Sequence, residues 1–166
     1  VMNMAATWDL PVLFIIENNK YGMGTDITRT TSVDALWKRA LAFDMAHSDC
    51  DGMNANTVLE HVSGIIETMR KDKKPHLLEA LTYRYRGHSV SDPGTYRTKD
   101  EVEDYQKNRD PILGMGKYLV ENKFATEEDL KGWDNEAKEA AKAAEAFADE
   151  SPEPAVEELW DHVLAP

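Results

Sequence analysis

Apolar positions in this chain of 166 residues occur either as short continuous runs or as stripes with helical spacing. Residues 11–17 and 76–82 are short apolar runs of the kind that forms buried strands. Between them, residues 33–43 and 56–71 carry apolar side chains at the spacing of one helix face. A strand, two helices and a second strand in this order predict an α/β fold with a parallel sheet and helical crossover connections.

A long polar segment separates this pattern from a second half that is predicted to be helical. The segment covers residues 83–98 and has no core pattern, and loops of this length in compact domains tend to be functional or mobile. Helices are predicted over residues 99–107, 111–121, 126–148 and 156–164. The remaining segments are predicted to be a helix end at residues 2–9, a loop at residues 18–31 and a turn at residues 49–52. We expect residues 1–98 to form the α/β domain and residues 99–166 to form a helical C-terminal extension that packs on it.

The net charge of -12 is concentrated near the end of the chain. Residues 125–166 contain 13 acidic and three basic residues, whereas residues 1–124 contain 18 acidic and 16 basic residues. An acidic segment repels phosphate, and no apolar run approaches the ~18 residues of a membrane helix. We therefore expect neither nucleic acid nor a membrane as a partner. An acidic helix face usually serves solvation, with contact to a basic partner subunit as the alternative. The single cysteine, Cys50, excludes an internal disulfide and fits a reducing compartment.

Polar residues directly follow the first predicted strand. Residues 17–24 read ENNKYGMG and come after the apolar run. The carboxyl ends of strands in open α/β sheets are where ligands bind. Amide and backbone oxygens suit Mg²⁺, usually together with a phosphate group. The segment is therefore a candidate metal site, and an ordinary turn built on asparagine and glycine is the other interpretation.

A second polar loop follows the second predicted strand. Arg84, Arg86 and Arg97 surround His88, and the sequence Asp-Pro-Gly at residues 92–94 indicates a turn. Arginine offers a planar fork for phosphate or carboxylate, and histidine can donate or accept one proton. This loop is a candidate active-site segment, and a solvated basic loop with an incidental histidine is the alternative.

Several motifs carry a resemblance to one family when they are taken in order. They lie at residues 3–8, 17–25, 51–53, 83–94, 96–98 and 110–112. Together they resemble the alpha subunit of the thiamine-diphosphate-dependent decarboxylase component of the 2-oxoacid dehydrogenase complexes, with the pyruvate dehydrogenase branch as the best match. Several ordered motifs are far more specific than one short pattern. The resemblance implies part of a parallel-sheet thiamine-diphosphate-binding fold.

The resemblance also implies roles for individual residues. The side-chain oxygen of Asn19 and the backbone carbonyl of Tyr21 would bind Mg²⁺, which clamps the diphosphate of thiamine diphosphate. Gly22 would let the backbone pass close to this metal. Arg84 would order the loop or bind the phosphate. His88 would be the catalytic residue, which hydrogen-bonds the cofactor phosphate or assists transfer of the acyl group to lipoyl.

By the same resemblance, the reaction is oxidative decarboxylation of pyruvate with acyl transfer to lipoyl. The implied partners are a beta subunit, in a heterotetramer, and the lipoyl-bearing acyltransferase core. The implied compartment is the bacterial cytoplasm, or the mitochondrial matrix in a eukaryote. Ser89 matches a position that is phosphorylated in eukaryotic relatives, and a plain turn hydroxyl is its other interpretation.

One expected motif does not occur in these 166 residues. The family's cofactor fingerprint begins with Gly-Asp-Gly, which is absent, so we expect this chain to be the C-terminal part of a longer subunit and to be inactive alone. Two alternatives stay open for the function. One is an acetoin or branched-chain 2-oxoacid dehydrogenase, and the other is a non-catalytic acidic α/β interaction domain. His47, His61, His76 and His162 are expected to be structural.

Overall fold

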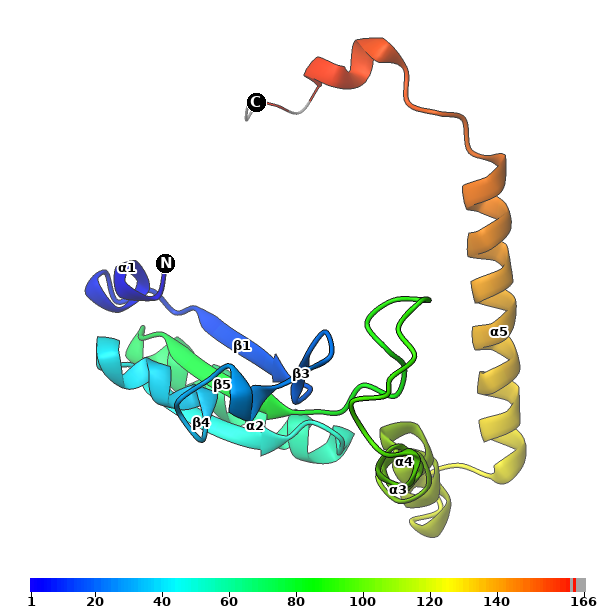
Figure 1. Ribbon diagram of the computed structural model, residues 1–166, viewed down its shortest axis with the longest axis horizontal. Coiled ribbons are helices and arrows are strands. Elements are labelled where there is room, and N and C mark those ends of the chain that lie inside the picture. The colour runs from blue at the N-terminus through cyan, green and yellow to red at the C-terminus, as the bar shows by residue number, and fades with distance from the viewer. Residues whose placement is uncertain (162, 164–166) are drawn as a thin grey trace. The chain divides into compact units, whose positions relative to one another are not determined.

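The computed structural model describes residues 1–161 and 163 (Figure 1). The chain divides into two compact units, Val1–Tyr118 and Leu119–Pro166. The division expected between residues 98 and 99 falls inside the first unit, where helix α3 (Lys99–Asn108) bonds to side chains that precede it. The division into functional domains stays a prediction.

The first unit is built on a sheet of three parallel strands in the order β1-β5-β4. These strands are β1 (Leu13–Asn18), β5 (His76–Leu81) and β4 (Ala46–Asp51). Leu13 and Ala46 both pair with His76, so the three strands run in step from the same edge. Their carboxyl ends therefore meet at one edge of the sheet. The expected α/β class with a parallel sheet is confirmed.

Strand β4 was not predicted, and the turn expected at residues 49–52 is wrong for residues 49–51. This strand has the sequence AHSDCD, and of its side chains only Cys50 is buried. An edge strand with so little buried surface lacks the apolar run by which β1 and β5 are found. The loop expected at residues 18–31 also contains a short hairpin, formed by β2 (Tyr21–Gly22) and β3 (Thr25–Asp26), and the 3₁₀ helix η1 (Ile27–Arg29).

Helices pack on both faces of the sheet. Helix α2 (Ala55–Asp72) begins at Asn54, whose side chain accepts a hydrogen bond from the Thr57 backbone, and it packs Ile65 and Met69 against one face. The 3₁₀ helix η2 (Leu36–Phe43) and helix α1 (Met2–Thr7) lie on the other face (Figure 1). An α-helix was expected over residues 33–43, and the observed element is shorter and wound as a 3₁₀ helix.

Successive side chains of β5 point to opposite faces of the sheet, as the pleat of a strand requires. Leu78 packs with Cys50, Ile65 and Met69, whereas Leu77 belongs to the cluster on the side of η2. Leu77 and Leu78 are 2% and 1% exposed, so this central strand carries the centre of both small cores.

Leu78→Ala is expected to lower the free energy of unfolding by about 2–5 kcal/mol, because it removes buried methyl groups and leaves a cavity. Leu59→Ala on helix α2 is the matched control, since that leucine is 67% exposed. Urea unfolding of both variants measures the difference. Equal losses in the two variants would contradict the packing of Leu78 in the core.

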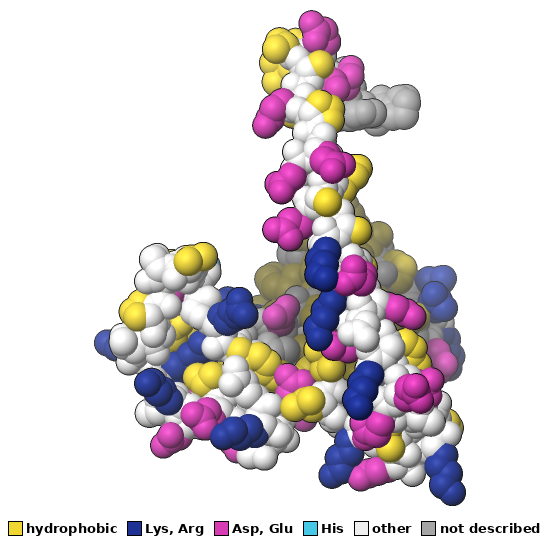
Figure 2. Space-filling view, turned by 90° about the vertical axis from the view of Figure 1, so that its right-hand side faces the viewer, with side chains coloured by type: hydrophobic (Ala, Val, Ile, Leu, Met, Phe, Trp, Pro, Cys, Tyr) yellow, Lys and Arg dark blue, Asp and Glu magenta, His cyan; other side chains and the backbone are white. Residues whose placement is uncertain are grey.

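Three of the remaining predicted helices are confirmed over most of their lengths. They are α3, α4 (Pro111–Glu121) and α5 (Glu127–Glu150). Thr126 and Asp129 form a reciprocal capping box at the start of α5. The helix expected over residues 156–164 is wrong in type and length, because the structure has only the 3₁₀ helix η3 (Val156–Trp160), and Asp161 and Val163 are not helical. Residues 162 and 164 lie outside the described residues. Figure 2 shows acidic side chains spread along α5, none of whose residues is buried. Among the described residues, no helix combines the length and the apolar character that a membrane crossing needs.

Candidate functional site

A tight turn carries the candidate metal ligands away from the carboxyl end of β1. The Asn18 carbonyl accepts a hydrogen bond from the Thr82 backbone at 2.9 Å, which ties the end of β1 to the end of β5. The Asn18 side-chain oxygen then accepts from the Lys20 backbone at 3.0 Å. Lys20 has φ of 69°, in the left-handed region that residues other than glycine rarely adopt. The side-chain bond from Asn18 stabilises this turn, which lies between Asn19 and Tyr21.

The Asn19 amide satisfies its hydrogen bonds in one orientation only. Its nitrogen donates to the Tyr21 carbonyl at 2.9 Å and its oxygen accepts from Nη2 of Arg84 at 3.0 Å. A half-turn of the amide would bring its oxygen to the nitrogen's position beside the Tyr21 carbonyl oxygen, where a bound cation would be needed to hold two acceptors together. Adjacent oxygens of a Mg²⁺ octahedron lie roughly 2.9 Å apart, given metal–oxygen distances of about 2.0–2.1 Å. The spacing of Asn19 and Tyr21 therefore fits two neighbouring ligands of Mg²⁺.

The structure joins the predicted site residues of both loops in one chain of contacts. Arg84 reaches Asn19 with one nitrogen and lies 3.5 Å from Nδ1 of His88 with another. Gly22 follows Tyr21 in β2, and a Cβ atom added there would meet nothing within 4 Å, so packing within this chain does not demand glycine. The roles of Asn19, Tyr21, Gly22, Arg84 and His88 stay predictions, but all five lie on segments that meet at the carboxyl edge of the sheet.

Arg97 anchors the second loop, although no sequence pattern singles it out above the other arginines. Its guanidinium donates to the Tyr85 carbonyl at 2.8 Å and to the Arg84 carbonyl. The same group lies 5.3–5.9 Å from the ring centres of Tyr21, Tyr83 and Tyr96. This arginine therefore fixes the backbone from which Arg84 projects and ties it to the hairpin that carries Tyr21.

Asp92 shapes the tip of the same loop. Its carboxylate accepts from the backbone of His88 at 2.7 Å, from the backbone of Gly94 at 2.9 Å and from the Tyr96 hydroxyl at 3.0 Å. The backbone bonds from His88 and Gly94 are the main cause that lowers the pKa of Asp92. A Cβ on Gly87 would lie 2.6 Å from Asp92, so glycine is needed there. Ser89 shares a 3.0 Å hydrogen bond with Ser91 and is exposed.

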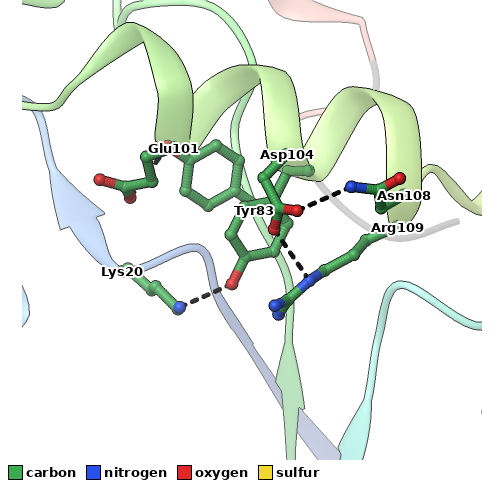
Figure 3. A network of polar contacts seen from close by, with 7 residues as sticks. Lys20, Tyr83, Glu101, Asp104, Asn108 and Arg109 are labelled. Carbon is green, nitrogen blue, oxygen red and sulfur yellow. Dashed lines mark hydrogen bonds and ion pairs between the residues drawn. The ribbon is translucent and has the colours of Figure 1, made fainter.

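Helix α3 closes over the start of this loop. The Tyr83 ring stacks on Tyr105 at 3.9 Å, and the hydroxyl groups of Tyr83 and Tyr21 both donate to Oε1 of Glu101, at 3.0 and 3.3 Å. Lys20 Nζ donates to the Tyr105 hydroxyl at 2.7 Å. Figure 3 shows Lys20, Tyr83 and Glu101 of this network, and beside them the bonds of Asp104 with Asn108 and Arg109 on or next to α3. The absence of a core pattern in residues 83–98 was misleading, because tyrosines anchor the loop.

The pKa values of two tyrosines are raised, that of the buried Tyr83 and that of the half-buried Tyr85. Burial, followed by the hydrogen bond to Glu101 and its charge, raises the pKa of Tyr83 to about 12. Burial and the bond to Asp110 likewise raise the pKa of Tyr85 to about 12. Both values lie above the pKa of about 10 for an unfolded tyrosine. The neutral phenols therefore contribute stability that is complete below pH of about 10 and is lost as the pH rises towards 12.

Tyr83→Phe is expected to flatten the fall in folding stability above pH of about 10, because the variant has no phenol at this position to ionise. Urea unfolding at several alkaline pH values compares the slopes of the variant and the parent chain. A spectroscopic titration in which Tyr83 ionises at the ordinary pKa of about 10 would contradict its burial beside Glu101.

Two hollows lie at the carboxyl edge of the sheet. The larger, of about 570 Å³, is lined by Asp51, Thr82 and residues of α2, α3 and α4, and it excludes Asn19 and Tyr21. The smaller, of about 210 Å³, is lined by residues 17–22 with Ile27, Thr30 and Leu36. We place the candidate metal site at the smaller hollow, because this hollow is lined by Asn19 and Tyr21, whose oxygen atoms are the candidate metal ligands.

The histidines expected to be structural lie away from this edge, as far as they are described. The Ser48 hydroxyl is 2.8 Å from Nε2 of His76 and 2.9 Å from Nε2 of His61. Burial, and then the neighbouring His61 and His47, lower the pKa of His76. His76 begins β5, so the cluster is near the amino edge of the sheet, and His162 is outside the described residues. In the described part of the chain, no group of three or more His, Cys, Asp or Glu side chains could hold a metal ion.

Comparisons with a family model and with known sequences find the same family. The family model described as dehydrogenase E1 component matches residues 1–157. The chain is 45% identical over 161 residues to a pyruvate dehydrogenase E1 component subunit alpha of Rickettsia bellii, covering 97% of this chain and 49% of the relative. It is 41% identical to the protein of the same name from Rhizobium meliloti, covering 98% of this chain and 47% of the relative. A chloroplastic subunit alpha-3 from Arabidopsis thaliana is 40% identical, with 99% and 38% covered.

The chain spans about half the length of the first of these relatives. Its parallel sheet with helices on both faces agrees with the fold that the sequence motifs imply. On the match over residues 1–157, the chain belongs to the dehydrogenase E1 component family.

Proposed function

We propose that this chain is part of the alpha subunit of a thiamine-diphosphate-dependent pyruvate dehydrogenase component and supplies it with metal ligands. The observation that carries the proposal is that the Asn19 amide bonds both to the Tyr21 carbonyl and to Arg84, so that candidate residues of the two loops are in contact at the carboxyl edge of the sheet. The identity of 45% to a pyruvate dehydrogenase alpha subunit supports pyruvate as the substrate.

In this proposal each site residue has a distinct task. Asn19 turns its amide oxygen to Mg²⁺ beside the Tyr21 carbonyl, and this rotation releases the Arg84 nitrogen that the same oxygen holds in the other orientation. Arg84 is then free to donate to a phosphate oxygen, for which its planar fork is suited. His88 lies next to Arg84 on an exposed part of the loop and exchanges a proton or hydrogen bond with the reacting groups. Thiamine diphosphate, when bound, supplies the stabilisation of the negative charge that remains after CO₂ leaves.

The partners follow from the same proposal. The relatives' names describe a subunit alpha of an E1 component, which supports a beta subunit as partner, and the proposed assembly is a heterotetramer. A lipoyl-bearing acyltransferase core would take the acyl group. We expect this chain alone to be inactive, and we expect the complete enzyme in the bacterial cytoplasm or in the mitochondrial matrix of a eukaryote.

The substrate is tested on the full-length subunit produced together with its beta subunit. With Mg²⁺ and thiamine diphosphate present, kcat/KM is measured for pyruvate, for a branched-chain 2-oxoacid and for acetoin. We expect pyruvate to be preferred, because a pocket discriminates against each extra methylene by about 10- to 200-fold. A preference for the branched-chain acid or acetoin would move the enzyme to that branch. Absence of reaction with all three substrates would favour the non-catalytic interaction domain.

A further inference from the structure

One buried acidic residue lies directly behind the candidate metal turn. Glu79 is in the middle of β5 and is 1% exposed, and it is the only charged side chain that is buried in the described part of the chain. Burying a carboxyl group is unfavourable unless hydrogen bonds replace its contacts with water. An apolar side chain would fill this place without that cost, as Leu77 does two residues earlier on the same face of the strand.

The Glu79 carboxylate joins three elements of the fold. Oε1 accepts from the side-chain nitrogen of Asn18 at 2.6 Å, at the end of β1. Oε2 accepts from the backbone of Trp37 at 3.0 Å, at the start of η2. Both carboxylate oxygens are therefore engaged by donors that come from other elements than β5.

The bond to Asn18 reaches the turn that holds Asn19 and Tyr21. With its nitrogen directed to Glu79, the Asn18 amide must present its oxygen to the Lys20 backbone, which it does at 3.0 Å. This second bond stabilises Lys20 in its left-handed conformation between the two candidate ligands. Rotation of the Asn18 amide would place donor against donor at Lys20 and acceptor against acceptor at Glu79.

We infer that Glu79 is a positioning residue for the metal-binding turn, acting through Asn18. It does not touch the metal, and the metal's role itself rests on the function proposed above. Partners that orient a metal ligand from behind typically change metal affinity by about 10- to 100-fold when they are lost. Glu79→Gln is therefore expected to raise the half-saturating concentration of Mg²⁺ with thiamine diphosphate roughly 10- to 100-fold in the assembled full-length enzyme, with a smaller change in kcat at saturation.

A reversed pair of side chains provides the decisive variant. In Glu79→Gln alone, the NH₂ group of the new carboxamide must face the donor group of either Asn18 or Trp37. Two donors cannot hydrogen-bond to each other, so one of the two bonds is lost. In the double variant Glu79→Gln with Asn18→Asp, the carboxamide nitrogen on β5 can donate to the new carboxylate on β1, and the carboxamide oxygen can accept from Trp37. The second oxygen of the new carboxylate can accept from Lys20. All three hydrogen bonds and the net charge are restored, so the double variant should regain most of the cofactor affinity that Glu79→Gln loses.

Leu77→Ala is the matched control, because it weakens the same face of β5 without touching Asn18. Hydrogen exchange of the Lys20 amide, measured without cofactor, gives a second readout that does not need a working active site. We expect faster exchange at Lys20 in Glu79→Gln than in Leu77→Ala at equal loss of global stability. Equal affinity losses in these two variants, or no recovery in the double variant, would overturn the inference. A parent enzyme that binds no cofactor would instead refute the proposed function, while the exchange at Lys20 still tests Glu79.

Discussion

His88→Ala is expected to lower the overall turnover of the assembled full-length enzyme by about 10²–10⁴-fold, the usual contribution of a positioned acid–base group. The side chain is exposed and contacts Arg84 at 3.5 Å, so its removal opens no cavity in the core. The melting temperature should therefore stay close to that of the parent enzyme. Turnover and melting temperature are measured on the same preparation.

His47→Ala is the control for this experiment. His47 stacks on Trp37 at 4.6 Å within the first unit, away from the candidate ligands, so its loss should reduce stability and spare turnover per folded molecule. If His88→Ala showed that same pattern, full activity with reduced stability, His88 would be a structural residue and the catalytic assignment of its loop would be wrong.

Asn19→Ala is expected to raise the half-saturating concentration of Mg²⁺ and thiamine diphosphate by roughly 10- to 100-fold or more. Loss of a residue that only supports a metal ligand already has an effect of roughly 10- to 100-fold. The variant removes one of about six oxygens around the metal, and a methyl group cannot replace it. Excess Mg²⁺ should restore much of the activity, because the defect is in retention of the metal and cofactor. Titrations of cofactor at low and high Mg²⁺ measure this.

Met23→Ala serves as the control for Asn19→Ala. Met23 follows β2 in the same hairpin region and is 63% exposed, so its truncation changes the surface of the hairpin without changing a candidate ligand. An unchanged half-saturating concentration in Asn19→Ala, or the same increase in both variants, would remove Asn19 from the metal site.

The sequence predicted those elements whose buried faces consist of continuous or periodic apolar residues. Strands β1 and β5 and helix α2 are of this kind, and the capping box at Thr126 marks the start of α5. Strand β4 was not predicted, because an edge strand with one buried side chain has no run of apolar residues. The winding of η2 as a 3₁₀ helix depends on packing against the sheet, which a stripe of apolar residues does not specify.

The candidate ligands could be predicted because they directly follow strands and belong to recognisable motifs. Their supporting residues could not, because each depends on a partner that is distant in the sequence. Glu79 bonds to a side chain 61 residues away, and Tyr21 bonds to Glu101 across 80 residues. In the sequence, Glu79 is only a polar interruption of an apolar run, and Arg97 is one arginine among several. The register of the parallel sheet places Glu79 near the end of β1, whereas the folded loop after β5 places Arg97.

A crystal structure of the full-length subunit with its beta subunit, thiamine diphosphate and Mn²⁺ in place of Mg²⁺ tests the central claim most directly. The anomalous signal of Mn²⁺ locates the metal independently of the protein atoms. The proposed function predicts a single peak within bonding distance of the Asn19 side-chain oxygen and the Tyr21 carbonyl, with Arg84 released from Asn19. A peak elsewhere, with the Asn19 amide still bonded to Tyr21 and Arg84, would contradict it.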